Sequence, residues 1–97
     1  MTVILSPEAV ERLEAQVAFL RDVEAFDAAE WLRSRIMNFL SNYLARYPRS
    51  GRPLGHDDLW EVWVPGTRLV LWYRIEEDCV LIATVWHTSQ DRRQTGP

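Results

Sequence analysis

The sequence predicts an α+β domain: a short N-terminal strand, an antiparallel helical hairpin and then a three-stranded antiparallel meander. Two stretches before Pro48 space their apolar residues three and four apart, which is typical of amphipathic helices. Three stretches after Pro48 are apolar and alternating, which is typical of strands. With 97 residues, the chain has the length of one domain, residues 1–97, in which residues from about 88 to 97 form a polar tail.

Residues 2–6 have the composition of a short strand, and a helix is expected to follow it directly. Ser6 is a residue type that caps helices, and Pro7 suits the first helical position. The expected apolar stripe of this helix is Val10, Leu13, Val17 and Leu20. Because residues 21–26 allow only a tight connection, the next helix should return antiparallel to the first.

The second helix is expected to begin near Asp27, which forms a capping-box pattern with Glu30. Phe26 and Trp31 are placed to pack together as a hydrophobic staple around that start. The expected apolar stripe is Leu32, Ile36, Phe39, Leu40, Tyr43, Leu44 and Tyr47. Pro48 then ends the helix, because proline lacks the backbone N–H that a helix interior needs.

Turn-forming residues occupy positions 48–55, and the three expected strands follow at about 59–64, 68–75 and 79–87. Alternation assigns one set to the face covered by the helices: Leu69, Leu71, Tyr73 and Ile75. It assigns the other set to the opposite face: Arg68, Val70, Trp72 and Arg74. The last strand is apolar on both faces, with Val80, Ile82 and Trp86 on one and Cys79, Leu81 and Val85 on the other.

This sheet has more apolar surface than a helical hairpin can cover, because the hairpin covers only one face. Some of four tryptophans are therefore expected on the uncovered face: Trp60, Trp63, Trp72 and Trp86. Either they complete the core or they form a surface for a partner, since tryptophan and arginine dominate protein interfaces. Arg68 and Arg74 would supply polar contacts in the second case, and would be solvated or paired with Glu61 or Asp78 in the first.

Composition excludes several classes of function. The net charge is −3, and all 11 basic residues are arginines, whereas nucleic-acid binders are usually strongly basic and lysine chemistry is absent here. The single Cys79 cannot form a disulfide framework, and no ligand spacing predicts a metal site, so no metal or cofactor is expected. No membrane helix or signal peptide is recognisable, which predicts a cytoplasmic protein without membrane contact.

Several segments, taken in order, carry a resemblance to a known family. They are Leu5-Ser6-Pro7-Glu8-Ala9, Tyr47-Pro48-Arg49-Ser50-Gly51-Arg52-Pro53, Arg68-Leu69-Val70, Tyr73-Arg74-Ile75, Val85-Trp86-His87 and Asp91-Arg92. From about residue 3 to residue 93 the chain resembles the RelE/ParE superfamily, the toxins of bacterial type II toxin–antitoxin systems. The run from Pro48 to Pro53 and the Tyr73-Arg74 strand look most like the ParE, or plasmid-stabilisation, branch.

The resemblance implies a toxin that arrests growth and that a cognate antitoxin neutralises by wrapping its tail around the helices and sheet. ParE-like members are understood to poison DNA gyrase by protein–protein contact, which is the favoured function. RelE-like members instead cleave mRNA on the ribosome, and an inactive relative that only binds an antitoxin is a third alternative. A toxin dimer or a toxin–antitoxin heterotetramer would be compatible with a free apolar face.

RNA cleavage would need a base, an acid and cations for the phosphate. The candidates are Glu61 and His87 as base or acid, with Arg68, Arg74 and Arg92 as phosphate partners. The acidic, lysine-free composition disfavours this chemistry, whereas Leu59-Trp60-Glu61 resembles the RNase-type relatives. His87 could equally cap or pack the end of its strand.

A function by binding would instead use arginines and tryptophans. The candidates for contact with the target or the antitoxin are Arg49, Arg52, Trp60, Trp63, Arg68, Trp72, Arg74, Trp86, Arg92 and Arg93. Arginine suits an acidic antitoxin tail because guanidinium binds carboxylate through two hydrogen bonds. The alternative is that the arginines near residues 46–52 belong to a solvated loop, and that those at 92 and 93 belong to a solubilising tail.

Overall fold

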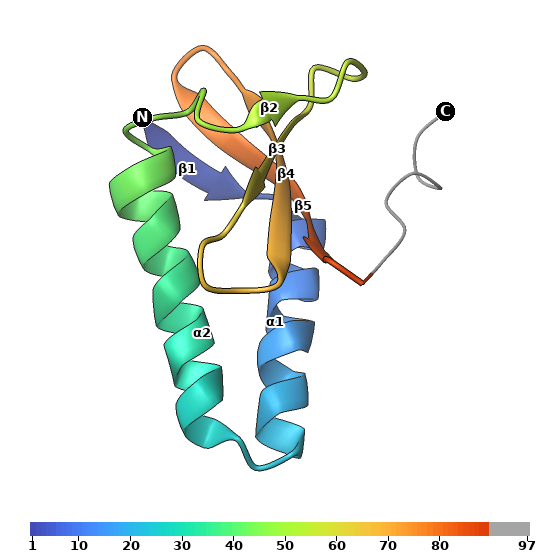
Figure 1. Ribbon diagram of the computed structural model, residues 1–97. Helices are drawn as coiled ribbons and strands as arrows, with labels where there is room; N and C mark the ends of the chain where they lie inside the picture. The colour runs from blue at the N-terminus through green and yellow to red at the C-terminus, as the bar shows by residue number, and fades with distance from the viewer. Residues whose placement is uncertain (90–97) are drawn as a thin grey trace.

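A computed structural model of the chain describes residues 1–89 and contains one sheet and one helical hairpin (Figure 1). The elements are β1 (Thr2–Leu5), α1 (Pro7–Asp22), α2 (Phe26–Asn38), the π-helix η1 (Phe39–Leu44), β2 (Arg52–Pro53), β3 (Trp60–Trp63), β4 (Leu69–Ile75) and β5 (Cys79–His87). The predicted α+β class is confirmed. The hairpin of α1 and α2 extends well beyond the end of the sheet (Figure 1).

The sheet has five strands in the order β1-β5-β4-β3-β2, so the predicted meander of β3, β4 and β5 is extended at both edges. β1 pairs parallel to β5, and the other neighbours are antiparallel. β2 comprises only two residues and lies within the segment predicted to be turn. The short first strand is stable because it joins the last strand rather than standing apart.

Helix α1 begins as predicted but buries a different stripe. The Ser6 hydroxyl accepts a hydrogen bond from the Ala9 N–H at 3.0 Å and donates one to the Ala83 carbonyl at 2.7 Å, so one side chain caps the helix and ties it to β5. The buried positions are Ala9, Leu13 and Val17, while Val10 is 46% exposed. Including Val10 in the stripe was therefore wrong, because the helix turns a small alanine toward the sheet there.

Helix α2 does not use the predicted capping box. It begins at Phe26, its N-cap residue is Ala25 with no side-chain hydrogen bond, and Glu30 forms an ion pair with Arg21 instead. Phe26 and Trp31 are 60% and 51% exposed, so they do not form a buried staple. Asp27 instead lies within the first turn of the helix, where the helix dipole favours a negative charge.

The second half of this helical segment widens into the π-helix η1 before the chain leaves it near Pro48. Leu32, Ile36, Phe39, Leu40 and Leu44 are buried as predicted. Tyr43 and Tyr47 are 44% and 52% exposed, which corrects their assignment to the core. Their rings continue a row that starts at Phe39, with centroids 5.3 and 5.4 Å apart.

A bidentate ion pair joins the two helices. Arg33 donates to both carboxylate oxygens of Glu14, at 2.9 and 3.0 Å. These hydrogen bonds, followed by the charge of Arg33, lower the pKa of the Glu14 carboxyl below its ordinary value. Both side chains are substantially exposed, so the pair orients the hairpin more than it stabilises it.

A β-bulge in β5 changes which residues face the helices. Trp72 lies opposite Thr84 and Tyr73 opposite Ile82, so Ala83 is an extra residue. Val80 and Ile82 precede the bulge and Val85 follows it, yet all three belong to the helix-facing core. Trp86 lies on the other face. The strict alternation that grouped Trp86 with Val80 and Ile82 was therefore wrong.

Two clusters of buried side chains result, one on each face of the sheet. The larger lies between the sheet and the helices and includes Tyr73, Ile36 and Leu44. The smaller lies on the helix-free face and consists of Leu59, Val70, Trp72 and Trp86, with Leu54 and Ala83 packed against it. Among the described residues no helix combines the length and apolar character needed to cross a bilayer.

Candidate functional site

The helix-free face of the sheet holds most of the predicted site residues, and Glu61 lies at its centre. Glu61, Trp72 and Thr84 are direct neighbours across β3, β4 and β5. One Glu61 carboxylate oxygen accepts a hydrogen bond from the Trp72 indole at 2.8 Å, and the other accepts one from Arg52 at 2.8 Å. The Glu61 side chain is only 10% exposed. Glu61 is thus a nearly buried acceptor that holds the neighbouring Trp72 and Arg52 side chains.

The four candidate tryptophans do not form one exposed surface. Trp60 lies on the helix-facing side and stacks with Tyr73 at a centroid distance of 6.3 Å, so it does not belong to the uncovered face. Trp63 is 61% exposed. Trp72 and Trp86 point to the helix-free face but are each only 7% exposed, with their rings 5.3 Å apart. Only Trp63 and the half-buried Trp60 therefore offer substantial surface to a partner.

Neighbouring side chains bury the tryptophan pair. The Arg12 guanidinium lies 4.3 Å from the Trp86 ring centroid, and the His56 ring meets Trp72 edge-on. Leu54 and Leu59, from the segment between β2 and β3, pack on the same cluster. The apolar surplus predicted for this face thus forms a second small core, because a loop and an arginine from α1 cover it.

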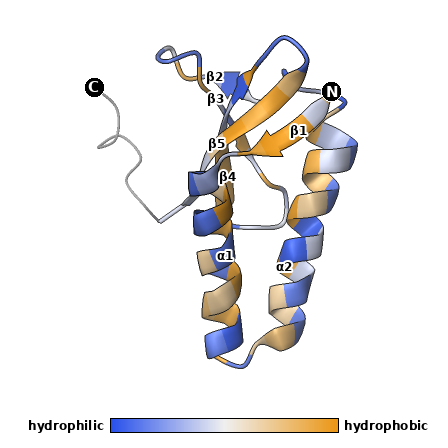
Figure 2. Ribbon diagram, turned by 180° about the vertical axis from the view of Figure 1, so that it is seen from behind, coloured by the Kyte–Doolittle hydropathy of each residue, from blue (hydrophilic) through white to orange (hydrophobic). Residues whose placement is uncertain are grey.

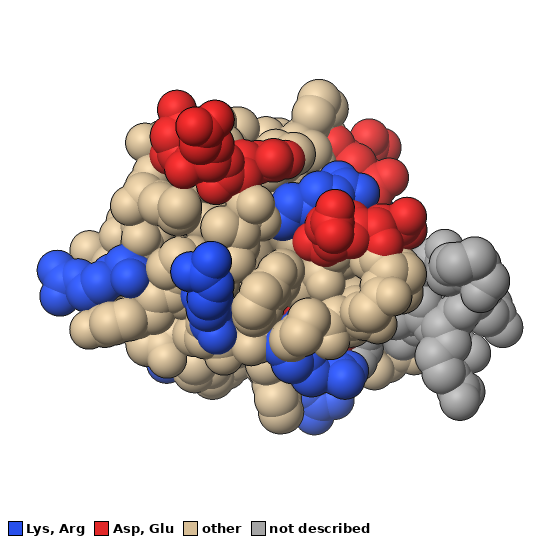
Figure 3. Space-filling model, turned by 90° about the horizontal axis from the view of Figure 1, so that it is seen from above, with Lys and Arg blue, Asp and Glu red and all other residues tan. Residues whose placement is uncertain are grey.

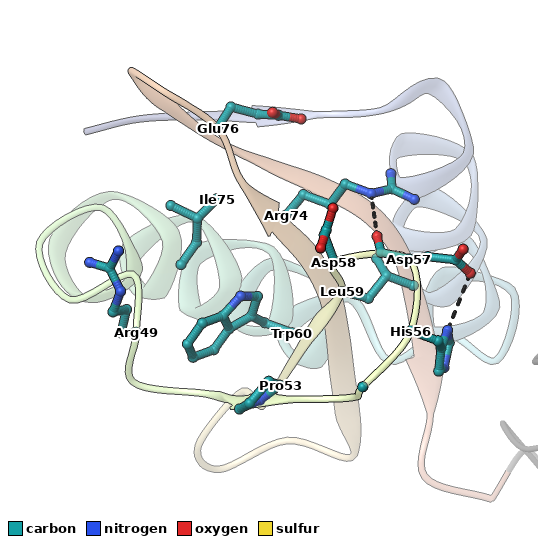
Figure 4. Close-up of a pocket in the computed structure, with 11 residues that line it drawn as sticks. Arg49, Pro53, His56, Asp57, Asp58, Leu59, Trp60, Arg74, Ile75 and Glu76 are labelled. Carbon is teal, nitrogen blue, oxygen red and sulfur yellow. Dashed lines mark hydrogen bonds and ion pairs between the residues drawn. The ribbon is translucent and has the colours of Figure 1, made fainter.

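A pocket of about 630 Å³ lies beside this cluster, at the end of the sheet near the loop that joins β2 to β3. Its lining includes Arg49, Pro53, His56, Asp57, Asp58, Trp60, Arg74, Ile75 and Glu76 (Figure 4). Trp60 lies in the middle of the view, with Arg49 on one side and Asp58 and Arg74 on the other. The fold thus brings together three of the predicted binding residues, Arg49, Trp60 and Arg74.

The loop that borders this pocket has an unusual backbone. Asp57 and Asp58 adopt φ values of 54° and 56°, in the left-handed region that non-glycine residues rarely occupy. Arg74 holds the loop by donating from Nε to the Asp57 carbonyl at 2.9 Å, and His56 lies 3.2 Å from the Asp57 carboxylate. Such backbone strain often accompanies binding sites, because the surrounding structure must maintain it.

His87 and Arg68 lie toward the other end of the sheet. His87 is opposite Leu69, whereas Glu61 is opposite Trp72, three residues further along β4. That separation is about 10 Å at the usual rise of a strand. The His87 ring nitrogen Nδ1 contacts the Ser89 hydroxyl at 2.7 Å, and Arg68 is exposed. The candidate base and acid are therefore not adjacent.

The remaining predicted residues are placed as follows. Arg52 lies on the edge strand β2. Its side chain forms an ion pair with Glu61 and is nevertheless 71% exposed. Arg92 and Arg93 fall outside the described residues. In Figure 3, which views the molecule from above, arginines are separated by acidic and uncharged surface, so the described residues form no continuous basic patch on this side. The described part of the chain also has no cluster of three or more possible metal-binding side chains.

Sequence reasoning missed the residues that hold the turn after the helices. The buried Tyr73 hydroxyl donates to the Pro48 carbonyl at 2.7 Å and accepts from the Gly51 N–H at 3.2 Å. A side chain at Gly51 would lie 2.4 Å from the Glu61 carbonyl, so only glycine fits there. The run from Pro48 to Pro53 is distinctive in the sequence, but nothing in the sequence connects it to Tyr73. Arg12 was missed as well, because its spacing from Glu8 is typical of a solvated helix face.

Known proteins resemble this chain in sequence or in fold over nearly its whole length. The model of the family described as the ParE toxin of the type II toxin–antitoxin system parDE matches residues 3–92. A solved chromosomal ParDE system from P. aeruginosa is similar, with a TM-score of 0.73 and 11% identity, covering 90% of this chain and 95% of that one. The toxin–antitoxin complex RelBE2 from Mycobacterium tuberculosis has a TM-score of 0.66 and 23% identity, with 92% of each chain covered. No curated protein matches the sequence significantly.

Proposed function

Since this chain belongs to the ParE toxin family of type II toxin–antitoxin systems, we propose that it inhibits DNA gyrase by protein–protein contact. A cognate antitoxin neutralises it in the cytoplasm, and the free toxin arrests growth and so favours retention of the plasmid or locus that encodes the pair. The alternative in the same superfamily is ribosome-dependent cleavage of mRNA. Both functions are compatible with the fold, so the choice rests on the side chains.

The state of Glu61 is the observation that carries the proposal. A general base for a ribose hydroxyl must have a carboxylate oxygen available to the proton that it removes. Both Glu61 oxygens accept hydrogen bonds, from Trp72 and from Arg52, and the side chain is nearly buried. An RNA hydroxyl would have to compete for the remaining lone pairs of a carboxylate that has little exposed surface and is already hydrogen-bonded through both oxygens.

The arrangement of the other candidates supports the same choice. His87 and Arg68 lie toward one end of β4 and β5, while Arg74 lies toward the other end and is bound to the Asp57 carbonyl. Phosphate cleavage needs these groups within hydrogen-bond reach of one phosphate. The net charge of −3 and the scattered arginines also provide little attraction for ribosomal RNA.

The pocket around Trp60, at the end of the sheet, is the part of the described surface best suited to a protein partner. It combines a half-buried indole with Arg49, for which the described residues provide no ion pair, and with Arg74. Tryptophan and arginine are the residues that most often dominate binding energy at protein interfaces. We assign this pocket, together with the exposed Trp63, to contact with the target.

A supercoiling assay with purified gyrase tests the proposal. The full chain should inhibit supercoiling, and a candidate antitoxin encoded next to it should relieve the inhibition. The double variant Arg49→Glu and Trp60→Ala should weaken inhibition at least tenfold, since it reverses a charge and removes an anchor. As a matched control, Arg68→Ala with His87→Ala should impair inhibition only partly, and much less than the first double variant.

Two results would contradict this assignment. Lack of inhibition at several-fold molar excess, together with mRNA cleavage on ribosomes that the Arg68 and His87 variant abolishes, would establish the RNase alternative. If cells express the chain without growth arrest and the chain still binds the antitoxin, it is an inactive relative that has lost toxicity. The experiment includes the RNA-cleavage assay because Leu59-Trp60-Glu61 resembles the RNase-type relatives.

A further inference from the structure

Two carboxylates in the lining of the pocket around Trp60 form no ion pair with the residues that the structure describes. They belong to Asp58, in the loop between β2 and β3, and to Glu76, which directly follows β4. The third acid of the lining, Asp57, contacts the ring of the preceding histidine at 3.2 Å, and its carbonyl accepts the hydrogen bond from Arg74. Because Asp58 and Glu76 are both exposed, their charges remain available to a ligand.

The backbone of the loop fixes the position of Asp58. This residue has a φ of 56°, and the N–H of Leu59, the next residue, donates to the His56 carbonyl at 3.0 Å and closes the loop. In Figure 4, Asp58 lies on one side of Trp60 and Arg49 on the other. The two sides of the pocket therefore carry opposite charges, with the indole between them.

Trp60 supplies a flat aromatic surface beside the carboxylates. Tyr73 stacks against its indole at a centroid distance of 6.3 Å but does not line the pocket. The part of the half-buried indole that Tyr73 leaves uncovered therefore borders the pocket. A cation is attracted both by the face of such a ring and by the neighbouring negative charges. Among side-chain cations, a guanidinium combines flat stacking with two hydrogen bonds to a carboxylate.

The charges around the pocket favour the same ligand. Glu77 and Asp78, in the turn between β4 and β5, are exposed as well, and no ion pair joins them to the part of the chain that the structure describes. Figure 2 shows this turn as hydrophilic, in contrast to the hydrophobic β5 that follows it. In Figure 3, which looks onto this end of the molecule, acidic side chains gather in groups. Such a negative field attracts a cation and repels the phosphates of a nucleic acid.

We propose that this pocket accepts an arginine side chain of the target protein, which stacks on Trp60 and pairs with Asp58 and Glu76. The inference rests on the proposed function, because it names the group that the target supplies at the same site. The pocket volume of about 630 Å³ lies in the range usual for ligand sites. Arg49, on the other side of the indole, stays available to an acidic or carbonyl group of the same target segment.

Removing the two charges without changing side-chain shape tests the proposal. The double variant Asp58→Asn with Glu76→Gln should inhibit supercoiling at least about tenfold less than the parent, because the cation loses its partners. Asparagine also tolerates the left-handed backbone at position 58, so the loop should keep its conformation. The matched control is Glu77→Gln with Asp78→Asn, which removes the same charge outside the pocket lining and should inhibit like the parent. Circular dichroism should be the same for all three proteins.

A titration with a small probe examines the pocket without gyrase. Nα-acetylargininamide should shift the nuclear magnetic resonance signal of the Trp60 indole N–H in a saturable way, with Trp60→Phe used to assign that signal. Nα-acetylcitrullinamide has nearly the same shape but no charge, and it should cause no such shift. The variant that lacks the Asp58 and Glu76 charges should not respond to the arginine probe.

The two assays separate the failure of this proposal from the failure of gyrase inhibition. A parent that inhibits gyrase, with a pocket variant that inhibits equally or more strongly, would overturn the arginine site and leave the proposed function intact. Equal losses in the pocket variant and in the control would also overturn it, since only net charge would then matter. If the parent does not inhibit gyrase, the probe decides. A response to arginine but not to citrulline would support the site for another target, whereas equal responses or none would overturn it.

Discussion

Two buried tryptophans on the same face differ in one hydrogen bond. The Trp72 indole donates to the Glu61 carboxylate, whereas the Trp86 indole nitrogen is buried without a partner among the described residues. Both side chains are 7% exposed and belong to one cluster. Replacing each in turn therefore compares the loss of a charge-assisted hydrogen bond at Trp72 with the loss of an unpaired indole N–H, and of part of the contact with Arg12, at Trp86.

We predict that Trp72→Phe destabilises the protein more than Trp86→Phe. Both variants lose similar volume, but only the first removes a hydrogen-bond donor from a nearly buried carboxylate. The difference in the free energy of unfolding should be about 1.5–3 kcal/mol, the usual contribution of a hydrogen bond to a charged group. Urea unfolding of both variants measures it, and equal losses would show that Glu61 is satisfied in another way.

Tyr73 should make the stability fall in alkaline solution. Burial raises the pKa of the Tyr73 hydroxyl, and the hydrogen bond from Gly51 only partly offsets this. In the unfolded chain the group titrates near its ordinary value of about 10. Above that pH the unfolded state loses a proton that the folded state keeps, so the free energy of unfolding decreases with rising pH.

The test of this prediction compares Tyr73→Phe with the parent. The variant should be less stable at pH 7, by about 1–3 kcal/mol, because the Pro48 carbonyl and the Gly51 N–H lose their partner. It should also lack the part of the alkaline decrease that Tyr73 contributes. Tyr47→Phe, at an exposed position, serves as the control and should behave like the parent. A parallel decrease in all three proteins above pH 10 would exclude Tyr73 as its source.

At the scale of single elements, the extra residue in β5 sets the two faces of the last strand. Ala83 lets Val85 enter the helix-facing core and Trp86 the opposite cluster. A strand without it would exchange these two side chains, because a one-residue shift reverses the face of every following side chain. The Ser6 hydroxyl, bonded to the Ala83 carbonyl, ties the start of α1 to the same point.

Deletion of Ala83 should therefore prevent stable folding, since residues 84–87 would place a valine and a tryptophan on the wrong faces. Deletion of Glu77, which is exposed in the turn between β4 and β5, is the matched control and should be tolerated much better. Circular dichroism and thermal unfolding of both variants give the comparison. Similar melting temperatures for the two deletions would show that the bulge can move along the strand.

At the scale of the whole molecule, two clusters share one sheet. The larger cluster needs the helices and the smaller one needs the loop between β2 and β3, yet β4 and β5 contribute to both. The side chains of β4 alternate between the two clusters. Unfolding of either cluster therefore requires β4 to move, which disrupts the other cluster as well. The domain is also small, which favours a single cooperative transition.

We expect the two faces to unfold together. Tryptophan fluorescence in a variant that retains only Trp72 and Trp86 reports on the smaller cluster, and far-ultraviolet circular dichroism reports chiefly on the helices. The urea midpoints from the two probes should coincide. An earlier fluorescence transition would indicate that the helix-free cluster opens by itself, and would make those tryptophans accessible to a partner.

Local signals determined the elements of this protein. Ser6 and Pro7 identify the start of α1, Pro48 lies just after the end of the second helical segment, and the alternating apolar runs identify β3, β4 and β5. These features depend on residues close together in the chain, so the sequence alone shows them. The sequence motifs between residue 5 and residue 92, taken in their order along the chain, also sufficed to recognise the toxin superfamily, which the family comparison confirms.

Tertiary structure decided how these elements combine. The parallel pairing of β1 with β5, the bulge at Ala83 and the contact between Tyr73 and Gly51 each join residues far apart in the chain. The burial of Trp72 and Trp86 likewise depends on Arg12 and on the loop at Leu54 and Leu59. Spacing within a segment carries no information about such contacts. The number of exposed tryptophans and the role of Glu61 therefore became evident only from the fold.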